Sequence, residues 1–342
     1  MDSIRVGLVG FGRFGKIHAS ALALVEDVEL TCICVSTRET AEAARKQLSV
    51  DVYSDYAEFL EKGRMDVVDI VSPNHLHAAQ AIGGMESGRD ILLEKPVAIS
   101  AGEAKRVVDV QRRTSSVVHV GLEARYTPFL KAFKSSLEDG SIADPTFAKI
   151  ESWRAPFRTG AGSWRYDGAK VGHQLLEEAI HHFDAAAWLF GTPESVWGFT
   201  DSPKNWDHGT FSTAVAVLEY PRTKVMIIDC LAGLSEHLLM EVSGEGAMIG
   251  MTESELDGSS SSSWIKKKDR SGRVLSEKVR VLSETENVAL EIQDYFQRLR
   301  AGKEPFVTLD DGVRALSIDL AAIDAIRSGT RVVPSEKLAP DV

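Results

Sequence analysis

Residues 4–15 read Ile-Arg-Val-Gly-Leu-Val-Gly-Phe-Gly-Arg-Phe-Gly, an apolar run that leads directly into a glycine-rich turn. The first six residues are typical of a buried strand, and the residues after the turn are typical of a helix. The turn has the spacing G-x-G-x-x-G. Its glycines at 10, 12 and 15 would allow a tight turn, close approach of the backbone to a pyrophosphate, and close packing of helix on strand.

The helix after this turn would present free amides and the positive end of its dipole to phosphate groups. In this strand-turn-helix context, the motif predicts a dinucleotide-binding loop. The residues expected to contact the cofactor there are Gly10, Phe11, Gly12, Arg13, Phe14 and Gly15.

Short apolar runs alternate with helical stretches up to about residue 122, which predicts a Rossmann domain with a doubly wound parallel sheet. Beyond that point, strand-like runs such as Thr213–Tyr220 and Lys224–Cys230 are separated by turns. These runs predict an open, mostly antiparallel sheet with helices on one face. We therefore expect a dinucleotide-binding domain over 1–122 and a substrate-binding and oligomerisation domain over 123–342. We leave open whether the terminal helix packs back on the first domain.

Composition restricts the class of protein. The chain has 342 residues, 44% of them apolar, and a formal net charge of −11. That acidity argues against non-specific nucleic-acid binding, which needs basic surface. The three cysteines suit buried, reduced thiols better than disulfides. We see neither a signal peptide nor an apolar run of membrane-spanning length, and we expect a cytoplasmic enzyme with no membrane partner.

Cofactor choice should depend on the end of the second strand, about 20 residues after the glycine motif, where an acidic residue selects NAD. Here the sequence is Ser36-Thr37-Arg38, with no carboxylate before Glu39. Hydroxyls and an arginine suit a 2′-phosphate, so we expect NADP to be favoured over NAD. The alternative is that Ser36 and Glu39 form a helix capping box, with Arg38 as an ordinary surface residue.

A second motif, Glu94-Lys95-Pro96, follows the strand expected at Asp90–Leu93. Ligands bind at this edge of open α/β sheets. A lysine there can donate to a substrate oxygen and stabilise a developing alkoxide. A lone lysine after a strand could equally be exposed to solvent without a role.

The glycine motif, residues 72–77 (Ser-Pro-Asn-His-Leu-His) and Glu94-Lys95-Pro96 together resemble the Gfo/Idh/MocA oxidoreductase family, and the likeness runs through the whole chain. The resemblance implies that Lys95 is catalytic and that the Lys95–Pro96 peptide is cis. It also implies cofactor contacts from Ser72, Pro73, Asn74, His75, Glu94 and Lys95.

The family's second signature is a helix with an acidic residue and, four positions later, a substrate-facing histidine. The stretch Leu175–Asp184 resembles it, which aligns Glu177 with the acidic residue and His181 with the acid/base histidine. In one continuous helix, Glu177, His181 and Asp184 would share a face beside an apolar stripe. A histidine suits proton exchange because it titrates near neutral pH.

This chain departs from the family pattern at Glu177 and Ala179, where aspartate and glycine are commoner, and in the segment before the helix. These departures leave the substrate open. Candidate substrate contacts are Arg125, Tyr126, Trp164, Arg165, Lys170 and His173. A di-iron site lacks its second motif. A zinc site on His173, Glu177 and His181 lacks a clear fourth ligand, so we expect no metal.

We therefore expect an NAD(P)-dependent oxidoreductase that moves hydride between the nicotinamide and a carbinol carbon of a sugar, cyclic polyol or related small molecule. Lys95 would polarise the oxygen, His181 would exchange the proton, and Glu177 would orient the histidine or hold a neighbouring hydroxyl. Two alternatives stay open: a cofactor-binding sensor without turnover, and an enzyme that uses the cofactor transiently in a redox-neutral reaction. The resemblance and the apolar strands of the second domain also imply a homodimer or homotetramer.

Overall fold

The computed structural model describes residues 3–156, 161–200, 213–233, 236–245, 247–254, 263–269 and 271–335. The described chain forms two compact units. The first comprises residues 1–123, 169–172 and 283–313, and the second comprises 124–168, 173–282 and 314–342. The expected boundary near residue 122 is close to the first division, but later segments also return to the first unit.

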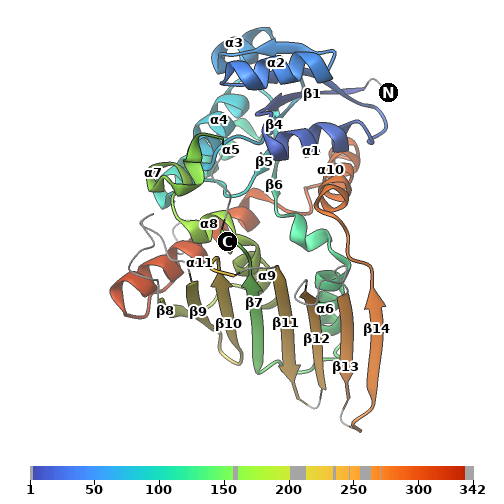
Figure 1. Cartoon of the computed structure of the whole chain (residues 1–342), viewed down its shortest axis with the longest axis vertical. Coiled ribbons are helices and arrows are strands. Elements are labelled where there is room, and N and C mark those ends of the chain that lie inside the picture. Colours follow the sequence, from blue (N-terminus) through green and yellow to red (C-terminus); the bar gives the residue numbers. More distant parts are fainter. Residues whose placement is uncertain are drawn as a thin grey trace. The chain divides into compact units, whose positions relative to one another are not determined.

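The first unit contains a six-stranded sheet in the order β3-β2-β1-β4-β5-β6 (Figure 1). Every strand pair in it is parallel, as expected for a doubly wound fold. The strands are β1 (Ile4–Val9), β2 (Val28–Cys34), β3 (Asp51–Tyr53), β4 (Val67–Ile70), β5 (Asp90–Glu94) and β6 (Val118–Gly121). The order reverses between β1 and β4, where open α/β sheets bind ligands at the carboxyl ends of their strands.

The helices of this unit connect successive parallel strands. They are α1 (Arg13–Leu22), α2 (Arg38–Gln47), α3 (Tyr56–Lys62), α4 (Asn74–Glu86) and α5 (Ala101–Thr114). The 3₁₀ turn η1 (Glu123–Tyr126) follows β6 and leads into the second unit. A late helix, α10 (Glu284–Arg300), packs beside α1. Its Ile292, Tyr295 and Phe296 are fully buried in one cluster with Val6 and Leu22. The first unit thus includes a helix from late in the chain, although α10 is not the terminal helix for which such packing was expected.

The second unit contains an eight-stranded sheet in the order β14-β13-β12-β11-β7-β10-β9-β8. Only the β7–β10 pair is parallel, which agrees with the expected mostly antiparallel sheet. The strands are β7 (Phe147–Trp153), β8 (Ser195–Thr200), β9 (Thr213–Glu219), β10 (Lys224–Cys230), β11 (His237–Gly244), β12 (Ala247–Ser254), β13 (Ser263–Lys268) and β14 (Val274–Val279).

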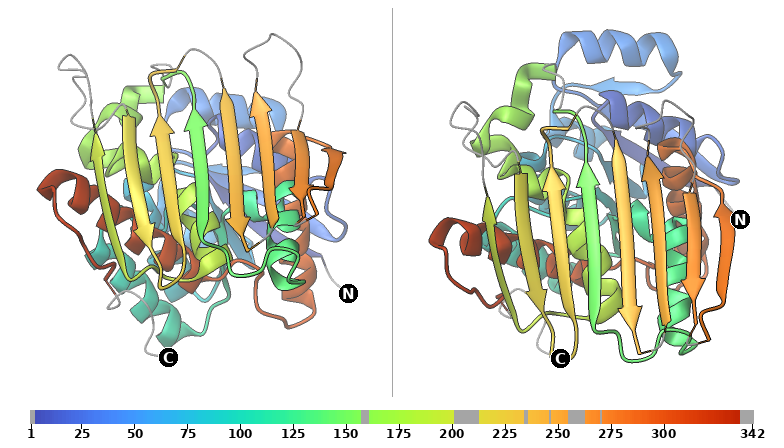
Figure 2. Two further views of the ribbon diagram at one scale, coloured as in Figure 1. Left: turned by 90° about the horizontal axis from the view of Figure 1, so that it is seen from below. Right: turned by 60° about the horizontal axis from the view of Figure 1, so that its bottom comes forward.

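The helical elements that complete the fold are α6 (Pro128–Glu138), η2 (Ala161–Tyr166), α7 (Gly168–Val171), α8 (Gln174–Glu177), α9 (Ile180–Phe190) and α11 (Leu309–Ser328). Figure 2 shows the second sheet with one broad face toward the viewer and this unit's helices behind it. Alternating burial along β9 and β10 follows from that arrangement: Ala216, Leu218 and Ile227 are buried against the helices, whereas Val215 and Val217 are only partly covered.

Two further expectations can be compared with the described part of the chain. Its cysteines, Cys32, Cys34 and Cys230, are buried and unbridged, as expected. Among the helices described, we find none with the length and hydropathy that a membrane span requires.

Candidate functional site

The glycine turn between β1 and α1 has the geometry that a dinucleotide needs. Gly10 has a φ of +102°, and a Cβ there would lie 2.5 Å from the carbonyl oxygen of Val71. A Cβ on Gly15 would lie 2.3 Å from the Gly10 carbonyl oxygen, so the close helix–strand packing requires glycine. At Gly12, by contrast, a Cβ would meet no atom within 4 Å. The open space at Gly12 beside the start of α1 fits a pyrophosphate.

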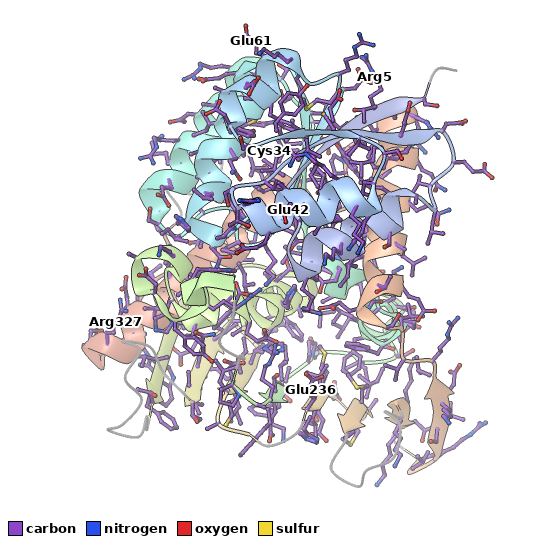
Figure 3. All side chains as sticks on the ribbon, turned by 45° about the horizontal axis from the view of Figure 1, so that its top comes forward. Arg5, Cys34, Glu42, Glu61, Glu236 and Arg327 are labelled. Carbon is purple, nitrogen blue, oxygen red and sulfur yellow. The ribbon has the colours of Figure 1, made fainter. Side chains whose placement is uncertain are left out.

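The end of β2 corrects one alternative from the sequence. The capping residue of α2 is Thr37, whose Oγ1 accepts from the backbone N–H of Thr40 at 3.2 Å. The capping box that the sequence suggested, Ser36 with Glu39, is therefore wrong, because the cap lies one residue later. Ser36 is exposed and contributes no cap. Arg38 is exposed and donates through Nε to Glu42 at 2.8 Å; Figure 3 labels Glu42 on α2.

The loop after β4 carries the Ser72-Pro73-Asn74-His75 stretch. Ser72 donates through Oγ to Gln80 Oε1 at 2.5 Å, and Asn74 donates through Nδ2 to the carbonyl oxygen of Val171 at 3.2 Å. Val171 belongs to the short α7 segment that is part of the first unit. Lys170 is on the same segment and is half-buried.

Lys95 lies directly after β5, half-buried, at the carboxyl edge of the parallel sheet. The Lys95–Pro96 peptide is cis, which confirms that expectation. The Lys95 backbone N–H donates to Glu94 Oε2 at 3.2 Å. A Cβ on Gly121 of the neighbouring strand would lie 2.5 Å from Glu94 Oε1, so this glycine leaves room for the Glu94 carboxylate.

A buried network of ionisable side chains is connected to the Lys95 backbone through the Glu94 carboxylate. The Glu94 Oε1 atom accepts from His18 Nε2 at 3.2 Å, and Asp69 accepts from His18 Nδ1 at 3.0 Å. Burial alone would lower the pKa of His18, but these two carboxylates outweigh it and raise that pKa well above its ordinary value. The same region includes Glu123. Burial raises the pKa of Glu123 to about 8; the charge of Glu94 adds to this rise and that of Lys95 opposes it.

The second signature differs from the continuous helix that the sequence suggested. Helix α8 ends at Glu177 and α9 begins at Ile180, with a break at Glu178 and Ala179. Glu178 is paired there with Arg154 from the end of β7, at 2.5 Å. The expected apolar stripe is buried (Leu176, Ile180, Phe183 and Ala187). Glu177 and His181, however, belong to two separate helices.

Glu177 is held by an arginine. Its carboxylate accepts from Arg165 Nε at 2.6 Å, and its side chain is buried. The guanidinium of Arg165 lies over the ring of Trp164, 4.5 Å from the centroid. His181 is half-buried on the first turn of α9. Glu177, Arg165 and Trp164 thus form one polar and aromatic group in the second unit.

Three other substrate candidates have contacts within the protein. Arg125 donates twice to Asp184, at 2.6 and 2.8 Å, and both side chains are fully buried. This geometry favours a structural pair, while Asp184 and His181 stay three residues apart on the same helix, α9. Tyr126 is also buried. His173 caps α8 by accepting from Leu175 N, and burial lowers the His173 pKa to about 3, so it is neutral near pH 7.

Sequence reasoning did not identify the buried ionisable group of His18, Asp69 and Glu123. A signal was present, because Asp69 interrupts the apolar run of β4 and His18 lies on the buried side of α1. Among the described residues, no group of three or more His, Cys, Asp and Glu side chains is arranged to hold a metal ion.

Two family models match the chain over most of its length. Residues 4–122 match the oxidoreductase family with an NAD-binding Rossmann fold, and residues 134–334 match the carboxyl-terminal α/β domain of that family. Among curated relatives, the chain is 26% identical over 351 residues to scyllo-inositol 2-dehydrogenase (NAD(+)) of Bacillus subtilis, covering 96% of each chain. It is 27% identical over 233 residues to myo-inositol 2-dehydrogenase of Thermotoga maritima, covering 66% of this chain and 68% of the relative.

Among solved structures, the fold is similar to scyllo-inositol dehydrogenase of Lactobacillus casei with bound NAD(H) and scyllo-inositol. The TM-score is 0.81 at 20% identity, with 97% of this chain and 99% of the other covered.

The glycine turn gives a test that separates folding from cofactor binding. Gly12→Ala should leave the melting temperature close to that of the wild type, because its Cβ meets no protein atom, but should weaken cofactor binding. Gly15→Ala should lower the melting temperature, because its Cβ would strike the Gly10 carbonyl. Thermal melts and cofactor titrations of both variants check this. Equal stability losses in the two variants would contradict it.

Proposed function

We propose, from the premise that this chain belongs to the oxidoreductase family with an NAD-binding Rossmann fold, that Lys95, His181 and Glu177 catalyse hydride transfer at a carbinol carbon of a sugar or cyclic polyol. The chain is an NAD(P)-dependent oxidoreductase acting on CH–OH groups. The observation that carries the proposal is the position of Lys95. It follows β5 at the carboxyl edge of the sheet, on the same edge as the glycine turn.

The residues Gly10–Gly15 would hold the cofactor's pyrophosphate, with the loop at Ser72–His75 and residues 94–95 beside the nicotinamide end. The bound nicotinamide supplies hydride acceptance and donation. Lys95 would donate a hydrogen bond to the reacting substrate oxygen and stabilise negative charge as it develops there. His181 would take the hydroxyl proton.

The structure favours one of the two roles that the sequence left open for Glu177. Its carboxylate is bound to Arg165, so we assign it to holding a neighbouring substrate hydroxyl together with that arginine. Trp164, which lies against Arg165, would offer an apolar face to the C–H groups of a ring. Relatives named for myo-inositol and scyllo-inositol point to the same substrate class.

Lys95→Ala should reduce turnover by about 10²–10³-fold and leave cofactor affinity largely intact, because stabilisation of an alkoxide acts on the transition state. The assay would follow NAD(P)H formation with myo-inositol, scyllo-inositol and glucose. Lys105→Ala is the matched control, since Lys105 is an exposed lysine paired with Asp109 on α5. Turnover of Lys95→Ala within a few-fold of that control would contradict the assignment.

We also propose that NADP(H) is preferred over NAD(H). The end of β2 has no carboxylate to hold a ribose 2′-hydroxyl, and Ser36 is not used as a helix cap. Arg38 is exposed at the start of α2, where its guanidinium could exchange Glu42 for a 2′-phosphate. The relative from Bacillus subtilis is named for NAD(+), so this chain would differ from it in cofactor choice.

Titration of both cofactors tests this preference. The wild type should bind NADP(H) more tightly, and Arg38→Ala should remove most of the difference, whereas Arg45→Ala on the same helix should not. A wild-type preference for NAD(H) would show that the 2′-phosphate is not bound by the Ser36-Thr37-Arg38 segment.

We further propose that the face of the second sheet opposite its helices is the interface of a homodimer or homotetramer. Strand register brings Phe199, Val215 and Ile228 into one row and Trp197, Val217 and Met226 into the next. Phe199 is 54% exposed and Trp197 is 37% exposed. A contiguous apolar surface of this kind is typical of an interaction site, and the face can pair with its own copy across a two-fold axis.

Light scattering at micromolar concentration should give at least a dimer mass. Phe199→Lys together with Val215→Lys should shift the mass toward the monomer, because two charges would enter an apolar interface. Leu275→Lys on β14, where the leucine is also 54% exposed, is the control for added charge. A wild-type monomer, or no change with the double variant, would count against this interface.

A further inference from the structure

We propose that two buried histidines, His18 and His77, are positioning residues that hold the Lys95 turn from both sides. His18 holds the carboxylate that precedes Lys95, and His77 holds the carbonyl that follows it. The proposal rests on the function proposed for Lys95. It adds two residues that would set the position of its amine without touching substrate.

On the amino-terminal side, His18 lies between two carboxylates. Its Nε2 donates to Glu94 Oε1 at 3.2 Å and its Nδ1 donates to Asp69 at 3.0 Å. The second oxygen of Glu94 accepts from the backbone N–H of Lys95 at 3.2 Å. The chain of contacts therefore runs from β4 through α1 to the end of β5 and reaches the Lys95 backbone.

On the carboxyl-terminal side, His77 joins two loops. Its Nδ1 lies 2.7 Å from the carbonyl oxygen of Pro96, and its Nε2 lies 2.7 Å from the carbonyl oxygen of Ser72. Both oxygens only accept, so a neutral His77 donates to one of them and a doubly protonated ring donates to both. His77 is 1% exposed on the first turn of α4. It thus fixes the turn after β5 to the turn after β4.

Burial makes these contacts strong determinants of position. Asp69 and His18 are essentially inaccessible to water, and Glu94 is 5% exposed. Burial raises the pKa of Asp69, and the charge of His18 opposes that rise. Two buried carboxylates and one imidazolium are costly unless every hydrogen bond is made, so the arrangement tolerates little displacement. Catalytic groups require such fixed geometry, since a displacement of about 1 Å can cost about 10²-fold in rate.

A substrate-independent experiment tests the positioning directly. The wild type, His18→Gln and His77→Gln would be reductively ¹³C-methylated, and the Lys95 resonance would be assigned by its loss in Lys95→Arg. We expect the Lys95 resonance to move or broaden in both glutamine variants. His119→Gln is the matched control, because His119 is a fully buried histidine of the same unit whose Nε2 lies 3.0 Å from Glu291 Oε1 on α10. An unchanged Lys95 resonance in both variants would overturn the proposal.

If His18→Gln does not fold, Asp69→Asn tests the same side of the turn with a nearly isosteric change.

Kinetics with an inositol substrate give a second readout. Each glutamine variant should lose about 10²-fold in kcat. Cofactor Kd should stay unchanged in His18→Gln, whereas His77→Gln also releases the Ser72 carbonyl of the loop assigned to the cofactor. In a Lys95→Ala background the same substitutions should cost almost nothing further, because they act through Lys95.

The outcomes separate the two proposals. Full activity of Lys95→Ala would refute the proposed function, and the Lys95 resonance would still decide whether the histidines position that turn. Inactive Lys95→Ala combined with wild-type kcat in both histidine variants would refute only the positioning role. Equal, additive losses in the Lys95→Ala background would show that the histidines stabilise the fold without acting through Lys95.

Discussion

The parallel pairing of β1 with β4 and of β4 with β5 is the constraint on which the first unit's functional geometry depends. Parallel strands end at the same edge, so three separate turns meet there: the glycine turn at Gly10, the turn at Ser72 and the turn at Lys95. The close approach of Gly10 to the Val71 carbonyl and the bonds of His77 to Ser72 and Pro96 link these turns to one another. The glycine turn and a cationic side chain are thereby held at the same edge of one sheet.

The ionisable groups buried behind this edge are unlike those buried in the second unit. Arg125 and Asp184 satisfy each other in a bidentate pair that joins η1 to α9. His18, by contrast, connects two carboxylates, one of which extends to the Lys95 backbone. Replacing a buried ion pair by apolar residues often costs little stability, so a network of this kind calls for a functional reason. Holding Lys95 in one position is such a reason.

Local sequence patterns predicted the parts of the site that depend on local geometry. The spacing of Gly10, Gly12 and Gly15 specifies a turn whose shape is set within six residues, and the structure has that turn. The cap of α2 was misplaced by one residue because Ser36 and Thr37 both suit a capping position. Helical periodicity likewise predicted the buried side of residues 175–187 correctly.

Long-range contacts account for what periodicity missed. The break between α8 and α9 occurs where Arg154, more than twenty residues earlier, pairs with Glu178. Arg125 looked like a substrate ligand because its buried partner Asp184 is distant in sequence. His18 and Asp69 are separated by 51 positions, and only the packing of α1 on β4 and β5 brings them together. The roles of Lys95, His181 and Glu177 remain predictions.

The most direct test of the account is a crystal structure of the enzyme with NAD(P)H and scyllo-inositol. The account predicts that Lys95 Nζ and a ring nitrogen of His181 both lie about 2.7–3.2 Å from the same substrate hydroxyl oxygen, on the carbon that faces the nicotinamide. Glu177 and Arg165 should contact a neighbouring hydroxyl. A complex in which the carbon facing the nicotinamide carries a hydroxyl that contacts neither Lys95 nor His181 would contradict it.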